Sequence, residues 1–153
     1  MNASIVSSGR LHIRPANGSD LDRAKVWLCA AGLPVEDLTA DHLAQFLVAM
    51  ENDNAVGMIG LEQFGVAGLL RSLVVDKGSR GAGVGRQLVA ALESAALENG
   101  AKELWLLTID ADLFFTRLGY AVADRADAPT VIRETAEFSS LCPGDAVLMY
   151  KKL

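Results

Sequence analysis

The segment VVDKGSRGAGVGRQLVAAL, residues 74–92, decides the fold. It passes from strand-forming residues through a polar turn containing Gly81, Gly83 and Gly85 into residues whose apolar positions recur at helical spacing. Successive backbone N–H groups in a glycine turn at the start of a helix form a concave site that an anion can approach closely. The segment therefore predicts a strand, an anion-binding turn and a helix in direct succession.

The spacing of these glycines excludes two common kinds of phosphate-binding turn. A P-loop ends in Gly-Lys-Ser/Thr, whereas Gly85 is followed by Arg86 and Gln87. A dinucleotide-binding turn has the pattern G-x-G-x-x-G, whereas Arg86 stands where the third glycine belongs. The turn is therefore typical neither of P-loop nucleoside triphosphatases nor of dinucleotide-binding domains.

Strand and helix patterns alternate on both sides of this segment, which predicts an α/β (α+β) domain. Short connections predict that the strands within residues 46–76 form an antiparallel meander. The helix that follows them should make the next strand parallel to the last strand of the meander. We expect strands at residues 10–16, 46–50, 56–64, 68–76, 103–108, from 120 and 146–152, and helices at 19–31, 40–45, 83–99, 110–118 and 130–138.

The composition indicates one domain that covers residues 1–153. The chain is 51% hydrophobic, which is enough to build a core. Its net charge is −5, with basic residues dispersed among acidic ones, which argues against a nucleic-acid surface. Its apolar runs are far shorter than the roughly 20 residues of a membrane-spanning helix. The first residues lack the pattern of a secretory signal, so we expect a cytoplasmic protein with no membrane contact.

Cysteine and histidine residues show no metal-binding pattern. Cys29 and Cys142 are too few and too far apart for a disulfide framework or a four-ligand zinc site. His12 and His42 are likewise separated without ligand spacing. The sequence therefore predicts no metal site.

The pattern Arg80-x-x-Gly83-x-Gly85 after LLRSLVVD resembles the acyl-coenzyme A signature of the GNAT N-acetyltransferase superfamily. The stretches IRPANGSDL and FFTRLGY resemble its opening and late elements. The resemblance implies a mixed, mostly antiparallel sheet flanked by helices and splayed between the fourth and fifth strands. It also implies acetyl-CoA as cofactor, with pantetheine along the strand before the turn and pyrophosphate on the turn amides. The cofactor contacts that it implies are Leu73, Val74, Val75, Arg80, Gly81, Ala82, Gly83, Val84, Gly85, Arg86 and Phe115.

Four further stretches, GLEQFG, LLRSLVVD, LTIDADLFFTRLGY and EFSSLCPGDAVLM, resemble the branch of this superfamily found in arsenic-resistance operons. This resemblance implies acetylation of a small amino-acid-like amine, such as an arsenic- or phosphinate-containing toxin. Two alternatives stay open, a coenzyme A-binding sensor without turnover and a protein or peptide N-acetyltransferase. The superfamily also favours a homodimer formed through the C-terminal strands.

Direct attack of an amine on the thioester needs a proton acceptor and a donor to the thioester oxygen. Glu62 is the candidate general base, because it is a carboxylate in an apolar strand beside the expected cofactor strand; a solvated strand carboxylate is the alternative. The superfamily implies a backbone amide near Val74 as the oxyanion donor. Phe115 stands at the position where the superfamily usually has a tyrosine that acts as general acid, so a tyrosine general acid is not expected at this position.

Three polar residues are candidates for substrate binding. Arg71 interrupts an apolar strand, so its guanidinium either clamps an anionic group of the substrate or forms a structural ion pair. Ser72 either binds a ligand or satisfies the local backbone. Arg133, in a later helical stretch, is a second candidate clamp or a solvated surface residue.

Overall fold

The computed structural model describes residues 11–33, 35–80, 83–141 and 145–153. Two of the predicted cofactor contacts, Gly81 and Ala82, lie outside the described residues, as does Cys142. The strands are β1 (Leu11–Pro15), β2 (Phe46–Glu51), β3 (Asn54–Phe64), β4 (Ala67–Val75), β5 (Glu103–Thr108), β6 (Ala121–Val122) and β7 (Val147–Lys152). The helices are α2 (Leu21–Ala30), α3 (Val84–Glu98), α4 (Asp112–Arg117) and α5 (Thr130–Arg133), with short helical turns η1 (Gly18–Asp20), η2 (His42–Gln45), η3 (Lys77–Ser79), η4 (Arg125–Asp127) and η5 (Glu137–Leu141).

The strands form one seven-stranded sheet in the order β1-β2-β3-β4-β5-β7-β6. Neighbouring strands are antiparallel except β4 and β5, which are parallel because α3 connects them. β4 pairs with β5 only through its first three residues, Ala67, Gly68 and Leu69. Beyond Leu69 the two strands separate, so the predicted splay between the fourth and fifth strands is confirmed.

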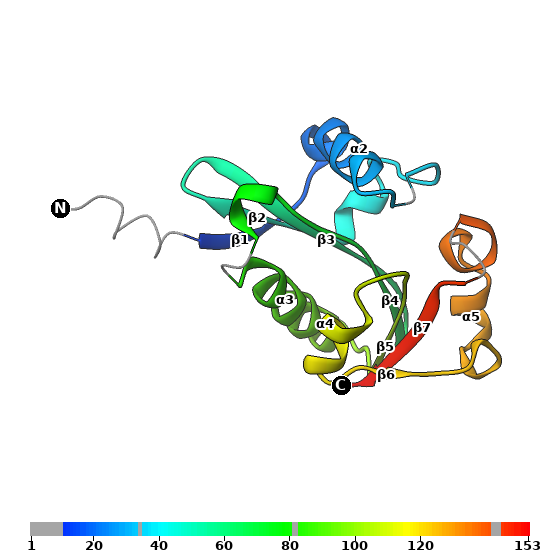
Figure 1. Cartoon of the computed structure of the whole chain (residues 1–153). Coiled ribbons are helices and arrows are strands. Elements are labelled where there is room, and N and C mark those ends of the chain that lie inside the picture. Colours follow the sequence, from blue (N-terminus) through cyan, green and yellow to red (C-terminus); the bar gives the residue numbers. More distant parts are fainter. Residues whose placement is uncertain (1–10, 34, 81–82, 142–144) are drawn as a thin grey trace.

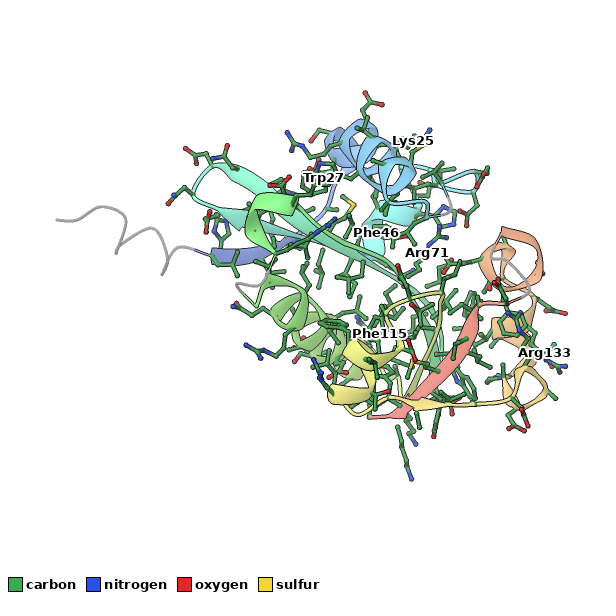
Figure 2. The ribbon with its side chains drawn as sticks, in the orientation of Figure 1. Lys25, Trp27, Phe46, Arg71, Phe115 and Arg133 are labelled. Carbon is green, nitrogen blue, oxygen red and sulfur yellow. The ribbon has the colours of Figure 1, made fainter. Side chains whose placement is uncertain are left out.

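Helices cover both faces of the sheet, but the two faces differ (Figure 1). On one face α3 and α4 pack over a continuous apolar cluster that includes Leu61, Leu70 and Leu88. On the other face α2 and α5 cover two separate clusters, one around Phe46 and one around Trp105. Figure 2 shows Arg71 between α2 and α5. A buried polar zone therefore lies between the two apolar clusters of this second face.

Two predicted elements differ in extent from the structure. The helix predicted at residues 19–31 begins with a 3-10 turn, in which Asn17 and Asp20 form a capping box, and continues as α2. The stretch predicted as helix at residues 130–138 is interrupted. The Thr135 hydroxyl donates a hydrogen bond to the Ile132 carbonyl at 2.7 Å. This side-chain bond competes with the backbone hydrogen bond that a continuing helix would make to the same carbonyl. α5 is therefore only four residues long, and a π-helical turn, η5, follows it.

Gly60 leaves room in β3 for the buried ring of Phe46. A Cβ atom at position 60 would lie 2.3 Å from Phe46 Cζ, and the ring is fully buried. We therefore expect Gly60→Ala to lower the free energy of unfolding by about 1–3 kcal/mol, as overpacked core substitutions do. Urea denaturation measures this, with Gly18→Ala as the control because its new Cβ comes no closer than 4.0 Å to Ala40. Equal stability of the two variants would refute this packing.

Candidate active site

The glycine turn joins the end of β4 to the start of α3. Gly83, the residue before α3, has φ +82°, a left-handed conformation that glycine adopts without strain. A Cβ atom at Gly85 would lie 3.3 Å from Phe114 Cζ, so glycine also permits close packing in the first turn. Arg80 donates from Nε to the Val75 carbonyl at 3.0 Å and so ties the turn to the end of β4. The turn thus stands at the positive end of a 15-residue helix, where an anion is favoured.

β4 carries a bulge immediately before this turn. Met58 pairs with Val74 and Gly60 pairs with Arg71, so three steps along β4 oppose two along β3. Ser72, inside the bulge, has φ +61°, an uncommon conformation for a residue with a side chain. Val74 is buried, whereas Leu73 and Val75 on either side of it are half-buried. The bulge therefore lies in the part of β4 that has separated from β5.

Arg71 is the centre of the buried polar zone. Its side chain is 0% exposed. The guanidinium donates from Nη1 to Glu62 Oε2 at 2.9 Å and to Asp37 Oδ2, and from Nη2 to Asp37 Oδ1 at 2.9 Å. Its Nε donates to Ser72 Oγ at 3.0 Å and lies 3.0 Å from Glu137 Oε2. Three carboxyl groups therefore surround one guanidinium.

This arrangement corresponds to the ion-pair alternative for Arg71. A substrate anion could reach the guanidinium only by displacing one of its present carboxylate partners. Ser72 correspondingly accepts a hydrogen bond from its neighbour rather than presenting a hydroxyl to open solvent. The direct role of these two residues in substrate binding stays a prediction.

Opposing effects set the pKa values in this zone. Burial lowers the pKa of Arg71, but the hydrogen bond to Asp37, the charge of Glu137 and the hydrogen bond to Glu62 raise it by more, so it lies above its ordinary value. Burial raises the pKa of Asp37, whereas the hydrogen bond and charge of Arg71, together with His42, lower it below its ordinary value. The pair of Arg71 and Asp37 is therefore ionised at neutral pH.

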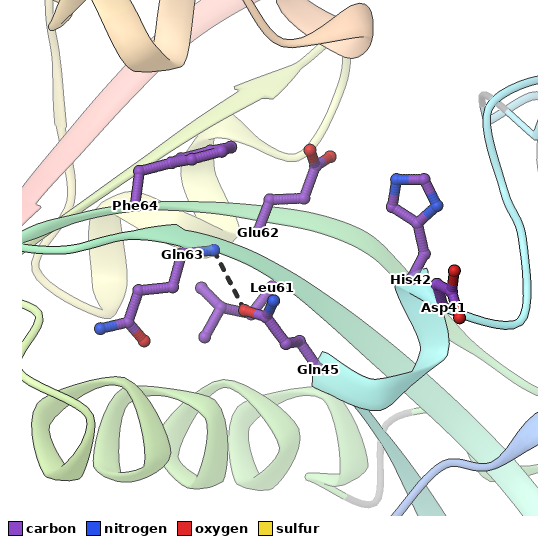
Figure 3. Close-up of a pocket in the computed structure, with 7 residues that line it drawn as sticks. All are labelled: Asp41, His42, Gln45, Leu61, Glu62, Gln63 and Phe64. Carbon is purple, nitrogen blue, oxygen red and sulfur yellow. Dashed lines mark hydrogen bonds between the residues drawn. The ribbon is translucent and has the colours of Figure 1, made fainter.

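Glu62 also borders a cavity of about 230 Å³ at the open edge of β3, shown in Figure 3. Pairing with β2 extends along β3 only to Gly60, so the last residues of β3 leave this edge uncovered by a strand. The Glu62 side chain is 15% exposed, which leaves it accessible from the cavity while it is ion-paired with Arg71. The cavity is lined by Asp41, His42, Gln45, Leu61, Glu62, Gln63 and Phe64.

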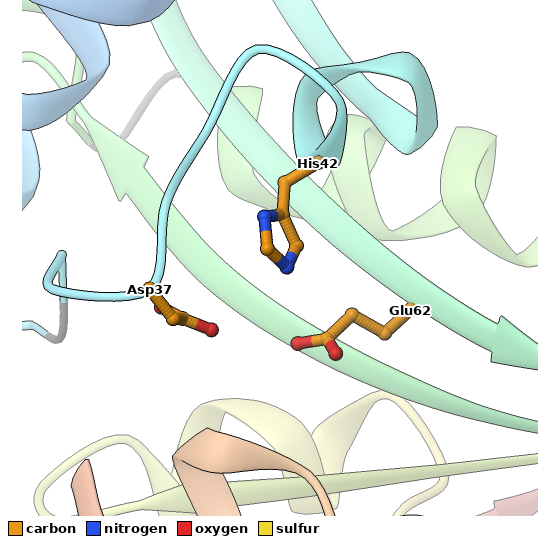
Figure 4. A group of neighbouring side chains, drawn as sticks. All are labelled: Asp37, His42 and Glu62. Carbon is orange, nitrogen blue, oxygen red and sulfur yellow. The ribbon is translucent and has the colours of Figure 1, made fainter.

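His42 lies close to the carboxylates of Asp37 and Glu62 (Figure 4). One donor atom from each of the three residues lies within 4.8 Å of the others, a spacing that a bound cation can bridge. His42 Nδ1 accepts a hydrogen bond from the Thr39 backbone N–H at 3.3 Å, so Nε2 carries the proton of the neutral ring. Since the two carboxylates already accept hydrogen bonds from Arg71, the described geometry gives no reason to assign a metal here.

The sequence alone did not identify Asp37, His42 or Glu137 as members of this zone. They come from the segment after α2, from η2 and from η5, and no short spacing connects them. The only sequence signal was Arg71 itself, because a buried guanidinium requires carboxylate partners. It could not indicate which carboxylates those are.

The remaining candidates lie away from Arg71. Arg133 is exposed on α5, and Figure 2 places it on the outer side of that helix. Phe115 is buried on the opposite face of the sheet, where its ring contacts Tyr120 edge to face. Tyr120 donates its hydroxyl to Glu93 at 2.8 Å. Burial, the charge of Glu93 and this hydrogen bond all raise the pKa of Tyr120, so its phenol is a weak acid.

Known proteins share this sequence pattern and this fold. Residues 42–122, more than half of the chain, match the family described as Acetyltransferase (GNAT) domain. An uncharacterized N-acetyltransferase of Chlorobaculum tepidum, CT2212, is 30% identical over 115 residues, which are 74% of each protein. The chain therefore belongs to the GNAT acetyltransferases, enzymes that take their acetyl group from acetyl-CoA.

Solved structures show the same fold at low identity. N-acetylglutamate synthase from Neisseria gonorrhoeae, complexed with coenzyme A and L-arginine, has a TM-score of 0.81 at 19% identity over 94% of this chain. This chain spans only 33% of the synthase chain. Rv2747 from Mycobacterium tuberculosis, in complex with CoA and NLQ, has a TM-score of 0.78 at 22% identity, covering 93% of this chain and 99% of that one. No helix among the described residues is long and apolar enough to cross a membrane.

Proposed function

We propose that this protein transfers the acetyl group of acetyl-CoA to the amino group of a small molecule held beside Glu62. The observation that carries the proposal is the position of the splay. β4 is not paired with β5 beyond Leu69, in the part of β4 that carries Arg71 and leads to the glycine turn. Acetyl-CoA bound on the turn is proposed to lay its pantetheine along this unpaired part of β4.

The proposed reaction is direct attack of the amine nitrogen on the thioester carbon. Glu62 takes a proton from the ammonium group, directly or through one water, and a backbone amide near Val74 stabilises the oxyanion. The nitrogen then loses its second proton to solvent, the C–S bond breaks, and coenzyme A leaves as a thiolate, which leaves a neutral amide. A thiol has an ordinary pKa of about 8.5, so departure needs no strong acid, and the phenylalanine at position 115 is compatible with turnover. Alignment of the two reactants can supply roughly 7–11 kcal/mol of the rate enhancement.

The cofactor contacts proposed for this reaction follow the turn and the bulge. Leu73, Val74 and Val75 offer backbone groups to pantetheine where β4 has lost β5 as a partner. Arg80, Gly83, Val84, Gly85 and Arg86 surround the start of α3 and offer amides and positive charge to pyrophosphate. The coenzyme A in the two structural neighbours supports coenzyme A as the ligand.

The acceptor is proposed to enter as a positively charged amine through the cavity at the edge of β3. Carboxyl groups outnumber cations around Glu62, which favours binding of an ammonium ion there. The resemblance to the arsenic-resistance branch favours an amino-acid-like acceptor with a phosphinate or arsinate group, and so a role in detoxification. That acceptor needs an anion site, for which Arg71 and Ser72 are the proposed groups beside Glu62. Arg133, exposed on α5, is a separate candidate.

A panel of acceptors tests this proposal. Purified protein is mixed with acetyl-CoA and either simple alkylamines, amino acids, their phosphinic and arsinic analogues, or peptides, and thiol release is measured. We expect at least one small amine to be acetylated well above the rate without acceptor, and peptides to be poorer acceptors than that amine. Preference for the phosphinic or arsinic compounds would support the detoxification role.

Two other results would contradict the proposal. Tight coenzyme A binding without turnover on any amine would favour a sensor. Faster acetylation of peptides than of every small amine would favour a protein N-acetyltransferase.

A further inference from the structure

Arg71 contacts the proposed base and the bulge that precedes the proposed oxyanion donor near Val74. Its Nη1 donates to Glu62, the proposed base, at 2.9 Å, and its Nε donates to Ser72 in the bulge at 3.0 Å. The guanidinium is planar and rigid, so these two bonds hold their acceptors at a fixed separation. One side chain therefore connects β3 to the bulge of β4.

Ser72 needs such support because its backbone conformation is unfavourable. A residue with a β-carbon rarely adopts φ +61°, and such conformations persist where surrounding contacts hold them. Ser72 is 7% exposed, and its hydroxyl oxygen accepts from Arg71 Nε. The hydrogen bond thus favours the backbone conformation of the bulge, which lies between the pair Arg71–Gly60 and the pair Val74–Met58.

Asp37 and Glu137 are the other two carboxylate neighbours of the guanidinium. Asp37 accepts from both Nη atoms, and Glu137 Oε2 lies 3.0 Å from Nε. Asp37 lies in the segment after α2, and Glu137 lies in η5. The guanidinium therefore has carboxylate neighbours from both parts of this face, the part covered by α2 and the part covered by α5. These contacts restrict rotation of the guanidinium plane.

We infer that Arg71 is a positioning residue that fixes the base Glu62 relative to the bulge between Arg71 and Val74, and so relative to the proposed oxyanion-donating amide near Val74. The inference rests on the proposed acetyl transfer, since it assigns Arg71 a role in that reaction that does not depend on contact with the substrate. A purely structural ion pair would affect stability but would leave the rate of the folded enzyme unaltered.

Paired substitutions at Ser72 separate these two roles. Ser72→Ala removes the acceptor and keeps the unfavourable left-handed backbone, whereas Ser72→Gly removes the acceptor but adopts that backbone freely. We expect Ser72→Ala to lower kcat about tenfold, as for a mispositioned oxyanion donor, with little change in the KM for acetyl-CoA. The kcat of Ser72→Gly is expected to be at least about threefold higher than the kcat of Ser72→Ala. Ser94→Ala, on the exposed side of α3, is the matched control for loss of a hydroxyl.

Arg71→Lys completes a double-mutant cycle. A lysine keeps the positive charge near the carboxylates but lacks the fork that reaches Ser72 and Glu62 together. We expect Arg71→Lys to lower kcat by tenfold or more and Ser72→Ala to add almost nothing in that background. Multiplicative losses in the double variant, or equal kcat for Ser72→Ala and Ser72→Gly, would overturn the inference.

A measurement on the protein without acceptor keeps this test separate from the proposed function. Amide ¹H–¹⁵N spectra of the full chain report the bulge through Val74, whose amide is adjacent in sequence to neither substituted residue. In Arg71→Lys and Ser72→Ala this signal is expected to shift or broaden, and in Ser72→Gly to stay nearer to the wild-type position. Absence of turnover in the wild type would refute the proposed function, whereas unshifted bulge signals in Arg71→Lys would refute the positioning role of Arg71.

Discussion

Glu62→Gln is expected to lower kcat for acetyl transfer by about a hundredfold to a thousandfold, the usual size of a general-base contribution. The amide has nearly the shape of the carboxylate and can still accept a hydrogen bond from Arg71 Nη1, but it cannot take a proton from the ammonium ion. Binding of acetyl-CoA should change little, because Glu62 lines the cavity at the edge of β3 and not the glycine turn. Steady-state kinetics with the best amine of the panel measures both quantities.

Glu98→Gln is the matched control, since this glutamate lies exposed at the end of α3. It should leave kcat and both KM values at their wild-type levels. A Glu62→Gln enzyme that retains more than a third of wild-type kcat would show that another group accepts the proton. His42 would then be the group to substitute next, because it lines the same cavity.

Gly83→Val is expected to weaken coenzyme A binding by about tenfold or more. Valine is strongly disfavoured at φ +82°, so the backbone before α3 must rotate and redirect the amides that face the pyrophosphate. Loss of even one hydrogen bond to a charged group costs about 1.5–3 kcal/mol, which corresponds to a tenfold change or more. Calorimetric titration of coenzyme A into the wild type and the variant measures the change.

Gly65→Val separates this effect from general strain. Gly65 also has a left-handed backbone, at φ +66°, but it lies in the turn between β3 and β4 with no atom within 4 Å of an added Cβ. We expect both variants to lose stability and only Gly83→Val to lose affinity for coenzyme A. Unchanged affinity in folded Gly83→Val would exclude the turn as the pyrophosphate site.

Local patterns predict much of this fold. The apolar spacing of residues 84–98 and the glycine at its start predict α3, and a helix between two strands predicts that β4 and β5 are parallel. Short polar turns predict the antiparallel order of β2, β3 and β4. These features depend on neighbours in the sequence, which is why the sequence reveals them.

The polar zone depends on contacts between distant segments. Asp37 lies 34 positions from Arg71 in the sequence and reaches it only because α2 packs on β2 and β3. Glu137 reaches it only because the helix after Pro129 is interrupted and continues as η5. The sequence marks Arg71 as an anomaly in an apolar strand, but the choice between a substrate clamp and an ion pair required the positions of these partners.

The most direct test of the proposed acetyl transfer follows the acetyl group itself. Acetyl-CoA labelled with ¹³C at the acetyl carbonyl is mixed with the protein and the best amine of the panel, and the carbonyl signal is followed by NMR. We predict that the label moves from the thioester to an amide of the acceptor, one for each thiol released, and that Glu62→Gln slows this transfer. Label that stays in bound acetyl-CoA with every amine, or appears only as free acetate, would contradict it.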